Sequence, residues 1–170
     1  PVISDLVAPE FTQIYVGETA TSVATYSVAN ASDVEVVLSG DDAFSVVSEA
    51  DGAVEIKFAP SAAGTFNGSL TITADGVVTE TINFSASAIL KPVISDLVAP
   101  VFSEIYVGET TTSIATFSVA NASNVEVELS GEAFSILSEA DGSVEIVFTS
   151  TTAGTFNGTL TITADEVVTD

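Results

Sequence analysis

A block of about 90 residues occurs twice in this chain, and this duplication limits what the chain can fold into. The segment Pro1–Pro9 returns unchanged 91 residues later, and about three quarters of positions 1–80 match the second copy. A period of this length suits a whole small domain, whereas solenoid repeats have periods of roughly 20–50 residues. We therefore expect two tandem domains, 1–88 and 92–170, joined by a linker at 89–91.

Apolar and polar residues alternate along most of each copy. In the segment 64–75, which recurs as 154–165, apolar residues and glycines occupy one parity, and Thr, Ser and Asn dominate the other. This is the pattern of a β-strand with one buried face and one solvated face. The same alternation predicts that Val54, Ile56 and Phe58 face inward.

Each complete copy is predicted to contain seven or eight short strands, with turns at intervals of about ten residues. Phe11–Val16 is one of these predicted strands, and Asp75-Gly76 is one of the turns. No segment shows the 3.6-residue period of a helix. Tyr26 is expected to be buried, because Phe117 replaces it in the second copy. The predicted fold class is all-β, with each copy forming a β-sandwich.

The second copy is predicted to lack its last strand. The first copy closes with a strand that carries Ile82 and Phe84, whereas the given sequence stops at Asp170, the counterpart of Glu80. Two explanations stay open: the strand follows in a longer chain, or a strand of another subunit fills the gap by β-strand addition. The preferred one is that the 170 residues are a window of a longer repeat array.

The composition excludes several functions. The chain carries 24 acidic and 2 basic side chains, a formal net charge of −22. This charge repels phosphate backbones and anionic lipid surfaces, so we expect no nucleic-acid partner. No run of about 18 apolar residues occurs, so membrane insertion is not expected. Cys and His are absent, which removes thiolate nucleophiles and the commonest general base, so we expect no enzyme and no catalytic residues.

Acidic residues in the predicted turns form the first candidate site. Calcium takes about six to eight oxygen ligands from carboxylates and carbonyls. No EF-hand loop occurs and the pair at positions 41 and 42 is not kept in the second copy, so solvated turn acids are the preferred interpretation. Melting with and without a chelator distinguishes the two, and no other cofactor is expected. The calcium candidates are Asp5, Asp41, Asp42, Asp51 and Asp75.

N-glycosylation is the second candidate. Five asparagines stand in N-x-[ST] sequences, and the alternation places three of them, at 67, 83 and 157, on the outer face of their strands. Because Ser and Thr are abundant, such sequences also arise by chance, and the intact mass of the native protein would reveal real glycans. The candidates are Asn30, Asn67, Asn83, Asn121 and Asn157.

A motif near the end of the first copy carries a family resemblance. It reads Phe58-x-Pro60-x-x-x-Gly64-x-Phe66-x-Gly68-x-Leu70-x-Ile72. It resembles the closing half of hydin-like immunoglobulin-like domains, which occur as tandem arrays in bacterial or archaeal cell-surface proteins. The second copy keeps this motif except that Ser150 replaces the proline. The resemblance implies immunoglobulin-like sandwiches in a cell-surface setting, and it brings no catalytic residues.

These observations favour a non-catalytic, extracellular structural repeat that forms the stalk of a surface adhesin or filament. Its expected partners are the neighbouring repeats of the same chain. One alternative is a donor-strand-type filament subunit whose partners are other subunits. Another is an accessory carbohydrate-binding module of a secreted protein, with a tyrosine as aromatic platform: Tyr15, Tyr26 and Tyr106 are the only tyrosines, and Trp is absent.

Overall fold

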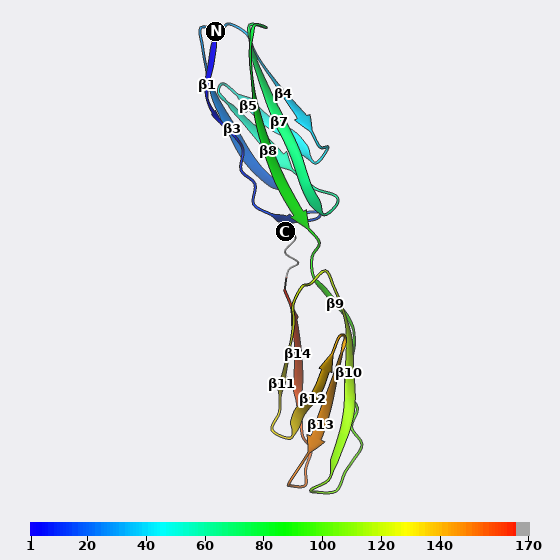
Figure 1. Ribbon diagram of the computed structural model, residues 1–170. Helices are drawn as coiled ribbons and strands as arrows, with labels where there is room; N and C mark the ends of the chain where they lie inside the picture. Colours follow the sequence, from blue (N-terminus) through cyan, green and yellow to red (C-terminus); the bar gives the residue numbers. More distant parts are fainter. Residues whose placement is uncertain (166–170) are drawn as a thin grey trace. The chain divides into compact units, whose positions relative to one another are not determined.

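The computed structural model describes residues 1–165 of the chain. These residues form strands, turns and loops (Figure 1), which confirms the all-β prediction. The chain divides into two compact units, unit 1 (Pro1–Leu90) and unit 2 (Lys91–Asp170). No helix in the described part is long and apolar enough to cross a lipid bilayer.

Unit 1 consists of two four-stranded sheets. One sheet has the order β1-β3-β6-β5, and the other has the order β2-β8-β7-β4. Neighbouring strands are antiparallel, except for the short parallel pair β2–β8. The strands are β1 (Val2–Val7), β2 (Ile14–Tyr15), β3 (Ala20–Ala29), β4 (Val34–Gly40), β5 (Phe44–Ala50), β6 (Ala53–Phe58), β7 (Gly64–Ala74) and β8 (Val78–Ile89).

The inner faces of the two sheets enclose one hydrophobic core, as the alternation predicts. Val54, Ile56 and Phe58 of β6 are fully buried, and so are Leu70 and Ile72 of β7. These five side chains occupy alternate positions because successive residues of a strand point to opposite faces. The core therefore lies where the sequence pattern places it.

The extent of one strand, the alternation of β5 and the burial of Tyr26 can each be compared with the sequence prediction. Within the predicted strand Phe11–Val16, only Ile14 and Tyr15 form a strand. A register irregularity between Val46 and Ser48 explains why β5 shows no clean alternation. Tyr26 is buried, as expected.

The end of unit 1 lies slightly beyond the expected boundary at residue 88. Strand β8 includes Ile89, which is buried and faces Tyr15 in the parallel β2–β8 pair. The carbonyl of Ile89 also accepts a 2.9 Å hydrogen bond from the backbone N–H of Val16. Ile89, the first residue of the expected linker 89–91, is therefore held in the first sandwich.

Unit 2 repeats this arrangement with fewer strands. One sheet has the order β12-β13-β10-β9, and the second contains β11 and β14. Among the described residues of unit 2, no strand corresponds to β2 or β8. The strands are β9 (Val93–Val98), β10 (Thr110–Ala120), β11 (Val125–Ser130), β12 (Phe134–Ala140), β13 (Ser143–Thr149) and β14 (Thr159–Ala164).

The lack of a β8 counterpart explains the other differences between the units. Ile105 and Tyr106, the counterparts of β2, form no ladder, and the described residues of unit 2 include no counterpart of β8, the strand that β2 pairs with in unit 1. Strand β14 begins at Thr159, although β7 begins at Gly64, the counterpart of residue 154. In unit 1 the residues Gly64–Asn67 pair only with β8, so the same sequence in unit 2 has no neighbour with which to extend the strand.

Candidate functional site

The feature of unit 2 that could receive a partner is an apolar groove of about 550 Å³ beside β14, which we call the β14 groove. One wall is formed by β14 and the loop before it, and the other by β9 and the loop that follows β9. Residues of β10, β11, β12 and β13 complete the lining. The lining residues are Leu97, Val98, Ala99, Pro100, Phe102, Ala115, Thr116, Leu129, Phe134, Ile146, Phe156, Asn157, Gly158, Thr159, Leu160 and Ile162.

Unit 1 shows what fills this space when the sandwich is complete. There β8 runs antiparallel along the whole of β7 (Figure 1), from Gly64↔Ala88 to Ala74↔Val78. Leu70 and Ile72 are fully buried under this neighbour, whereas their counterparts Leu160 and Ile162 remain partly exposed. The β14 groove is therefore the position that β8 occupies in unit 1.

The aromatic side chains give the same comparison. In unit 1 the ring of Phe84 on β8 lies edge-on to Phe44, with the ring centroids 5.0 Å apart, and 6.3 Å from Phe11. Phe134 and Phe102 are the counterparts of Phe44 and Phe11. Their ring centroids lie 5.5 Å apart, and both rings line the groove. Unit 2 thus keeps the aromatic surface against which a Phe84-like ring would pack, without that ring.

A glycine marks where the aromatic ring of β8 crosses β7. A Cβ atom on Gly68 would lie only 2.5 Å from the ring of Phe84, so no larger residue fits under this ring. The counterpart Gly158 lines the groove, although no ring from β8 covers it. In unit 2 a Cβ atom at this position would lie 2.8 Å from the ring of Phe134 and 2.9 Å from the carbonyl oxygen of Ser130, so the glycine is required there by its own unit.

Two apolar residues of unit 2 are more exposed than their counterparts in unit 1. Leu97 is 65% exposed and Tyr106 is 83% exposed, whereas their counterparts Leu6 and Tyr15 are half-buried. Among the described residues, β14 pairs with β11 alone, so one of its edges carries no ladder there. An open strand edge next to apolar surface is suited to binding another strand.

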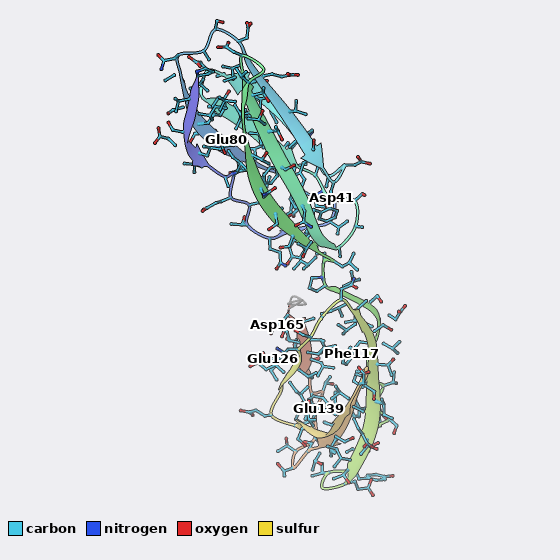
Figure 2. The ribbon with its side chains drawn as sticks, turned by 45° about the horizontal axis from the view of Figure 1, so that its top comes forward. Asp41, Glu80, Phe117, Glu126, Glu139 and Asp165 are labelled. Atoms are coloured by element: carbon cyan, nitrogen blue, oxygen red, sulfur yellow. The ribbon has the colours of Figure 1, made fainter. Side chains whose placement is uncertain are left out.

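The groove lining contains no charged side chain, and acidic residues lie outside it. Glu126 of β11 and Glu139 of β12 (Figure 2) line a separate hollow of about 470 Å³. Within residues 1–165, no three Asp or Glu side chains come together as a metal-binding group. No acid–base pair or nucleophile is present in the groove, so its chemistry is that of apolar contact and backbone hydrogen bonding.

The five calcium candidates lie in separate turns and at strand ends instead of forming one cluster. Asp5 lies in the irregular part of β1, Asp42 in the turn after β4, and Asp51 in the β5–β6 turn. The carboxylate of Asp41, at the end of β4 (Figure 2), accepts a 2.6 Å hydrogen bond from the backbone N–H of Asn67. This contact gives Asp41 a structural task in holding two strand ends together.

Asp75 also has a structural partner. Its Oδ1 atom accepts hydrogen bonds from the backbone N–H groups of Ser32 and Asp33, at 3.0 and 2.9 Å, and from the Ser32 hydroxyl at 3.1 Å. The backbone N–H groups of Asp33 and Ser32 lower the pKa of the Asp75 carboxyl below its ordinary value. This carboxylate therefore joins the β3–β4 turn to the β7–β8 turn.

The glycosylation candidates lie at the surface. Asn30, Asn67, Asn83 and Asn157 are exposed, and Asn121 is half-buried, with its side-chain amide donating a 3.2 Å hydrogen bond to the Lys91 carbonyl. Asn67 and Asn83 are exposed on β7 and β8, whereas Asn157 is exposed in the loop before β14, outside any strand. Whether any of them carries a glycan stays a prediction.

The tyrosines give limited support to a carbohydrate platform. Tyr26 is buried, and both its burial and the nearby Glu49 and Asp51 raise the pKa of its phenol. Tyr15 is half-buried, so only Tyr106 presents an open ring in the described part. Tyr106 is 83% exposed, and it is not among the residues that line the β14 groove.

Sequence reasoning found the missing strand but did not find the groove residues. The signal was available in the first copy: the strand that carries Ile82 and Phe84 must have apolar partners, and those partners recur in the second copy. What the alternation could not show is that residues of β9 and of the loop after it, such as Leu97 and Phe102, also line this groove.

Comparison with solved structures identifies the fold. The I67–I69 I-band fragment of titin aligns with a TM-score of 0.50 at 9% identity, covering 94% of this chain and 63% of that one. Titin domains z1z2 in complex with telethonin align at 0.49 and 14% identity, covering 93% of both chains. The Ig1–2 module of the Drosophila receptor protein tyrosine phosphatase DLAR aligns at 0.37 and 16% identity, covering 85% of this chain and 82% of that one.

The chain is a tandem of immunoglobulin-like β-sandwiches. This statement concerns the fold alone, because the identities are low. No model of a known protein family matches the sequence, and no curated protein matches it.

Proposed function

We propose that the chain is a non-catalytic structural repeat that acts as a spacer in the stalk of an extracellular surface protein, such as an adhesin or filament. The observation that carries this proposal is the duplication of a whole immunoglobulin-like sandwich with about three quarters of its residues unchanged. A domain that reads a ligand is expected to differ from its structural neighbours, whereas spacer units need only fold and connect.

The connection between the two sandwiches supports the spacer role. Strand β8 ends at Ile89 and β9 begins at Val93, so the connecting backbone consists of Leu90, Lys91 and Pro92. A proline fixes one φ angle and restricts the residue before it, which limits hinge motion. The connection contains no glycine, so it differs from the Gly-rich linkers that act as flexible tethers.

The charge distribution is also consistent with a spacer. Each unit carries twelve acidic side chains and one lysine, so the formal charge is −11 on each. Like charges on successive units oppose collapse of one unit onto the next, within the Debye length of about 8 Å at physiological salt. A cell-surface setting and protein partners fit the fold, which hosts many extracellular recognition modules.

Small-angle scattering from chains of two, three and four repeats tests this proposal. A spacer predicts a maximum dimension that increases by the same amount with each added repeat, with little change between low and physiological salt. Chains in which the short connection is replaced by a Gly-Ser linker provide the control and should show a smaller increase per repeat. A compact particle whose dimension hardly grows from two to four repeats would rule out the spacer role.

A further inference from the structure

We propose that the outer face of the β1-β3-β6-β5 sheet of unit 1 binds the same face of a second copy of the chain. We call this surface the outer β6 face. The contact is a property of one sandwich, so it does not depend on the spacer role. The face is defined by six side chains that lie outside the core: Val7, Val23, Val47, Ala53, Glu55 and Lys57.

Three aliphatic side chains give this face its apolar character. Val7, Val23 and Val47 are 46–56% exposed. On the outer face of the other sheet the exposed Val37 becomes Glu128 in the second copy. The outer β6 face differs, because its three aliphatic positions stay aliphatic and exposed in unit 2, as Val98, Ile114 and Leu137.

The backbone register places these side chains together. Val23 faces Glu55 across β3 and β6, and Val7 lies one row along, in line with Ala53. Diagonal neighbours on one face of adjacent strands are about 7–8 Å apart, so Val7 and Val23 adjoin each other. Val47 lies in the irregularity of β5, next to the residue that faces Glu55 from the other side. Glu55 is therefore surrounded by aliphatic side chains.

The edges of this sheet direct a partner to its face. Strand β1 has a register irregularity between Ser4 and Val7, and β5 has one between Val46 and Ser48. Asp5, within the first irregularity, has a φ of 52°. Irregular and charged edges oppose the addition of another strand. A partner is therefore expected to pack across the face, as two sheets do in a sandwich, about 10 Å away.

Glu55 and Lys57 make the face complementary to itself. Both alternate with the buried residues of β6, and Lys57 is the only basic residue of unit 1. The Ser48 hydroxyl donates a 3.2 Å hydrogen bond to Oε2 of Glu55 and so holds this carboxylate in place. In a two-fold contact between equal faces the roles of two residues are exchanged. Glu55 of each copy then meets Lys57 of the partner subunit.

Unit 2 lacks this complementarity. Val147 replaces Lys57, whereas Glu145 is kept and accepts the equivalent 3.2 Å hydrogen bond from the Ser138 hydroxyl. A two-fold contact between two unit 2 faces brings carboxylates together without a cation, which is unfavourable. The contact is therefore assigned to unit 1. The aliphatic side chains supply the buried area, and the exchanged charge pairs set the orientation.

The size of the face makes this a weak contact. Four strands about 4.8 Å apart, paired over about six residues, cover roughly 400 Å², which is half of what each partner buries in a standard interface. The net charge of −22 opposes approach, but nine of the twelve acidic residues of unit 1 lie outside the four strands of this sheet. Their field is screened beyond about 8 Å at physiological salt. The contact therefore suits chains that are held side by side at high effective concentration.

Two charge-reversal variants of the chain 1–170 test the contact. Glu55→Lys presents two lysines and Lys57→Glu presents two acids, so each variant repels its own kind and attracts the other. NMR at physiological salt is expected to show amide shifts at residues 21–25 and 53–58 when the labelled first variant is titrated with the unlabelled second. The mixture should associate at least about tenfold more tightly than either variant alone. The parent chain should show the same shifts, with concentration, up to millimolar protein.

Glu35→Lys provides the matched control for net charge. Glu35 lies on the outer face of the other sheet, and its replacement gives the same formal charge of −20 as Glu55→Lys, since one Glu becomes Lys in a chain of −22. Mixed with Lys57→Glu, it should not reproduce the tighter association. Dispersed amide signals of the unit 1 core verify that each variant is folded.

Three outcomes overturn the proposal. The first is a parent chain whose amide shifts do not change with concentration up to millimolar protein. The second is a mixture of the two charge-reversal variants that binds no more tightly than the control mixture. The third is a set of shifts confined to the β4, β7 and β8 strands, which would assign self-association to the other sheet. None of these changes the growth of maximum dimension with repeat number, so the spacer role is judged separately.

Discussion

Asp75 shows how one surface residue can join distant parts of the sandwich. It lies in the β7–β8 turn with a φ of 49°, a left-handed backbone conformation that Asp and Asn tolerate better than most residues. Its carboxylate accepts three hydrogen bonds from Ser32 and Asp33, more than forty residues earlier in the chain. The counterpart Asp165 accepts a weaker 3.3 Å bond from the Asn124 side chain.

Replacing Asp75 by Asn is expected to lower the Tm of unit 1 by a few degrees at neutral pH. Asn keeps the φ tolerance and one acceptor oxygen, so the change isolates the carboxylate charge. The pKa of Asp75 is lowered in the folded state, so its stabilisation is complete above the ordinary value of 3.8 and is lost as the pH falls through the folded pKa. The difference between the parent chain and Asp75→Asn should therefore shrink in acid, which calorimetry at several pH values measures.

The matched control for this prediction is Asp42→Asn. Asp42 is an exposed turn residue in the same unit, and its replacement removes the same charge without removing the contact with Ser32 and Asp33. Its effect on Tm should be close to zero. An equal loss in both variants, or a difference for Asp75→Asn that stays constant down to strongly acidic pH, would contradict the assigned role.

Strand β8 is the element on which the complete sandwich depends. It pairs with β7 along its length and with β2 at its end, and it contributes Ile82, Phe84, Ala86 and Ala88 to the core. Its two partners differ in unit 2: the counterpart of β7 is the shorter strand β14, and the counterpart of β2 forms no strand, although the sequences are nearly the same. Identical local sequences thus take different structures because their tertiary neighbours differ.

Phe84→Ala is expected to destabilise unit 1 by about 3–5 kcal/mol, because it removes a buried ring and leaves a cavity next to Phe44. Asn83→Ala on the outward face of the same strand should change the stability by less than about 0.5 kcal/mol. Urea unfolding followed by NMR signals of the unit 1 core measures both. A loss of similar size in the two variants would show that strand pairing, and not inward packing, dominates the contribution of β8.

Most of the fold could be predicted from the sequence, and the site could be predicted in part. Alternation identified the buried residues of β6 and β7, because a strand with one wet face must alternate. It failed at Phe11–Val16, where only two residues find a ladder partner, and in β5, where an irregularity shifts the register. Those outcomes depend on partners far away in sequence, and so does the exposure of Leu97 and Tyr106.

The two units differ in completeness while sharing almost the same sequence. Phe44 and Phe58 are buried in unit 1, and their counterparts Phe134 and Phe148 are only partly buried. This comparison separates the effect of one strand from the effect of sequence. The stability of the chain 1–170 should therefore be unequal between its two halves.

Thermal unfolding of the chain 1–170 is expected to show two transitions, with unit 2 unfolding first. Within the chain 1–170, the described residues of unit 2 include no counterpart of β8. In unit 1 that strand supplies an inward aliphatic and an inward aromatic residue, which contribute roughly 1.5–3 kcal/mol each, together with a ladder of hydrogen bonds at about 1 kcal/mol apiece. These losses are large compared with the total stability of about 5–15 kcal/mol that a domain has. Calorimetry measures the transitions, and NMR signals of Tyr106 and Tyr26 assign them to the two units.

Equivalent core variants in the two units provide the control for this order of unfolding. Phe58→Ala should lower the temperature of the upper transition only, and Phe148→Ala should lower that of the lower transition only. A single cooperative transition that both variants lower would show that the two sandwiches unfold as one body, and the order predicted from the missing strand would be wrong.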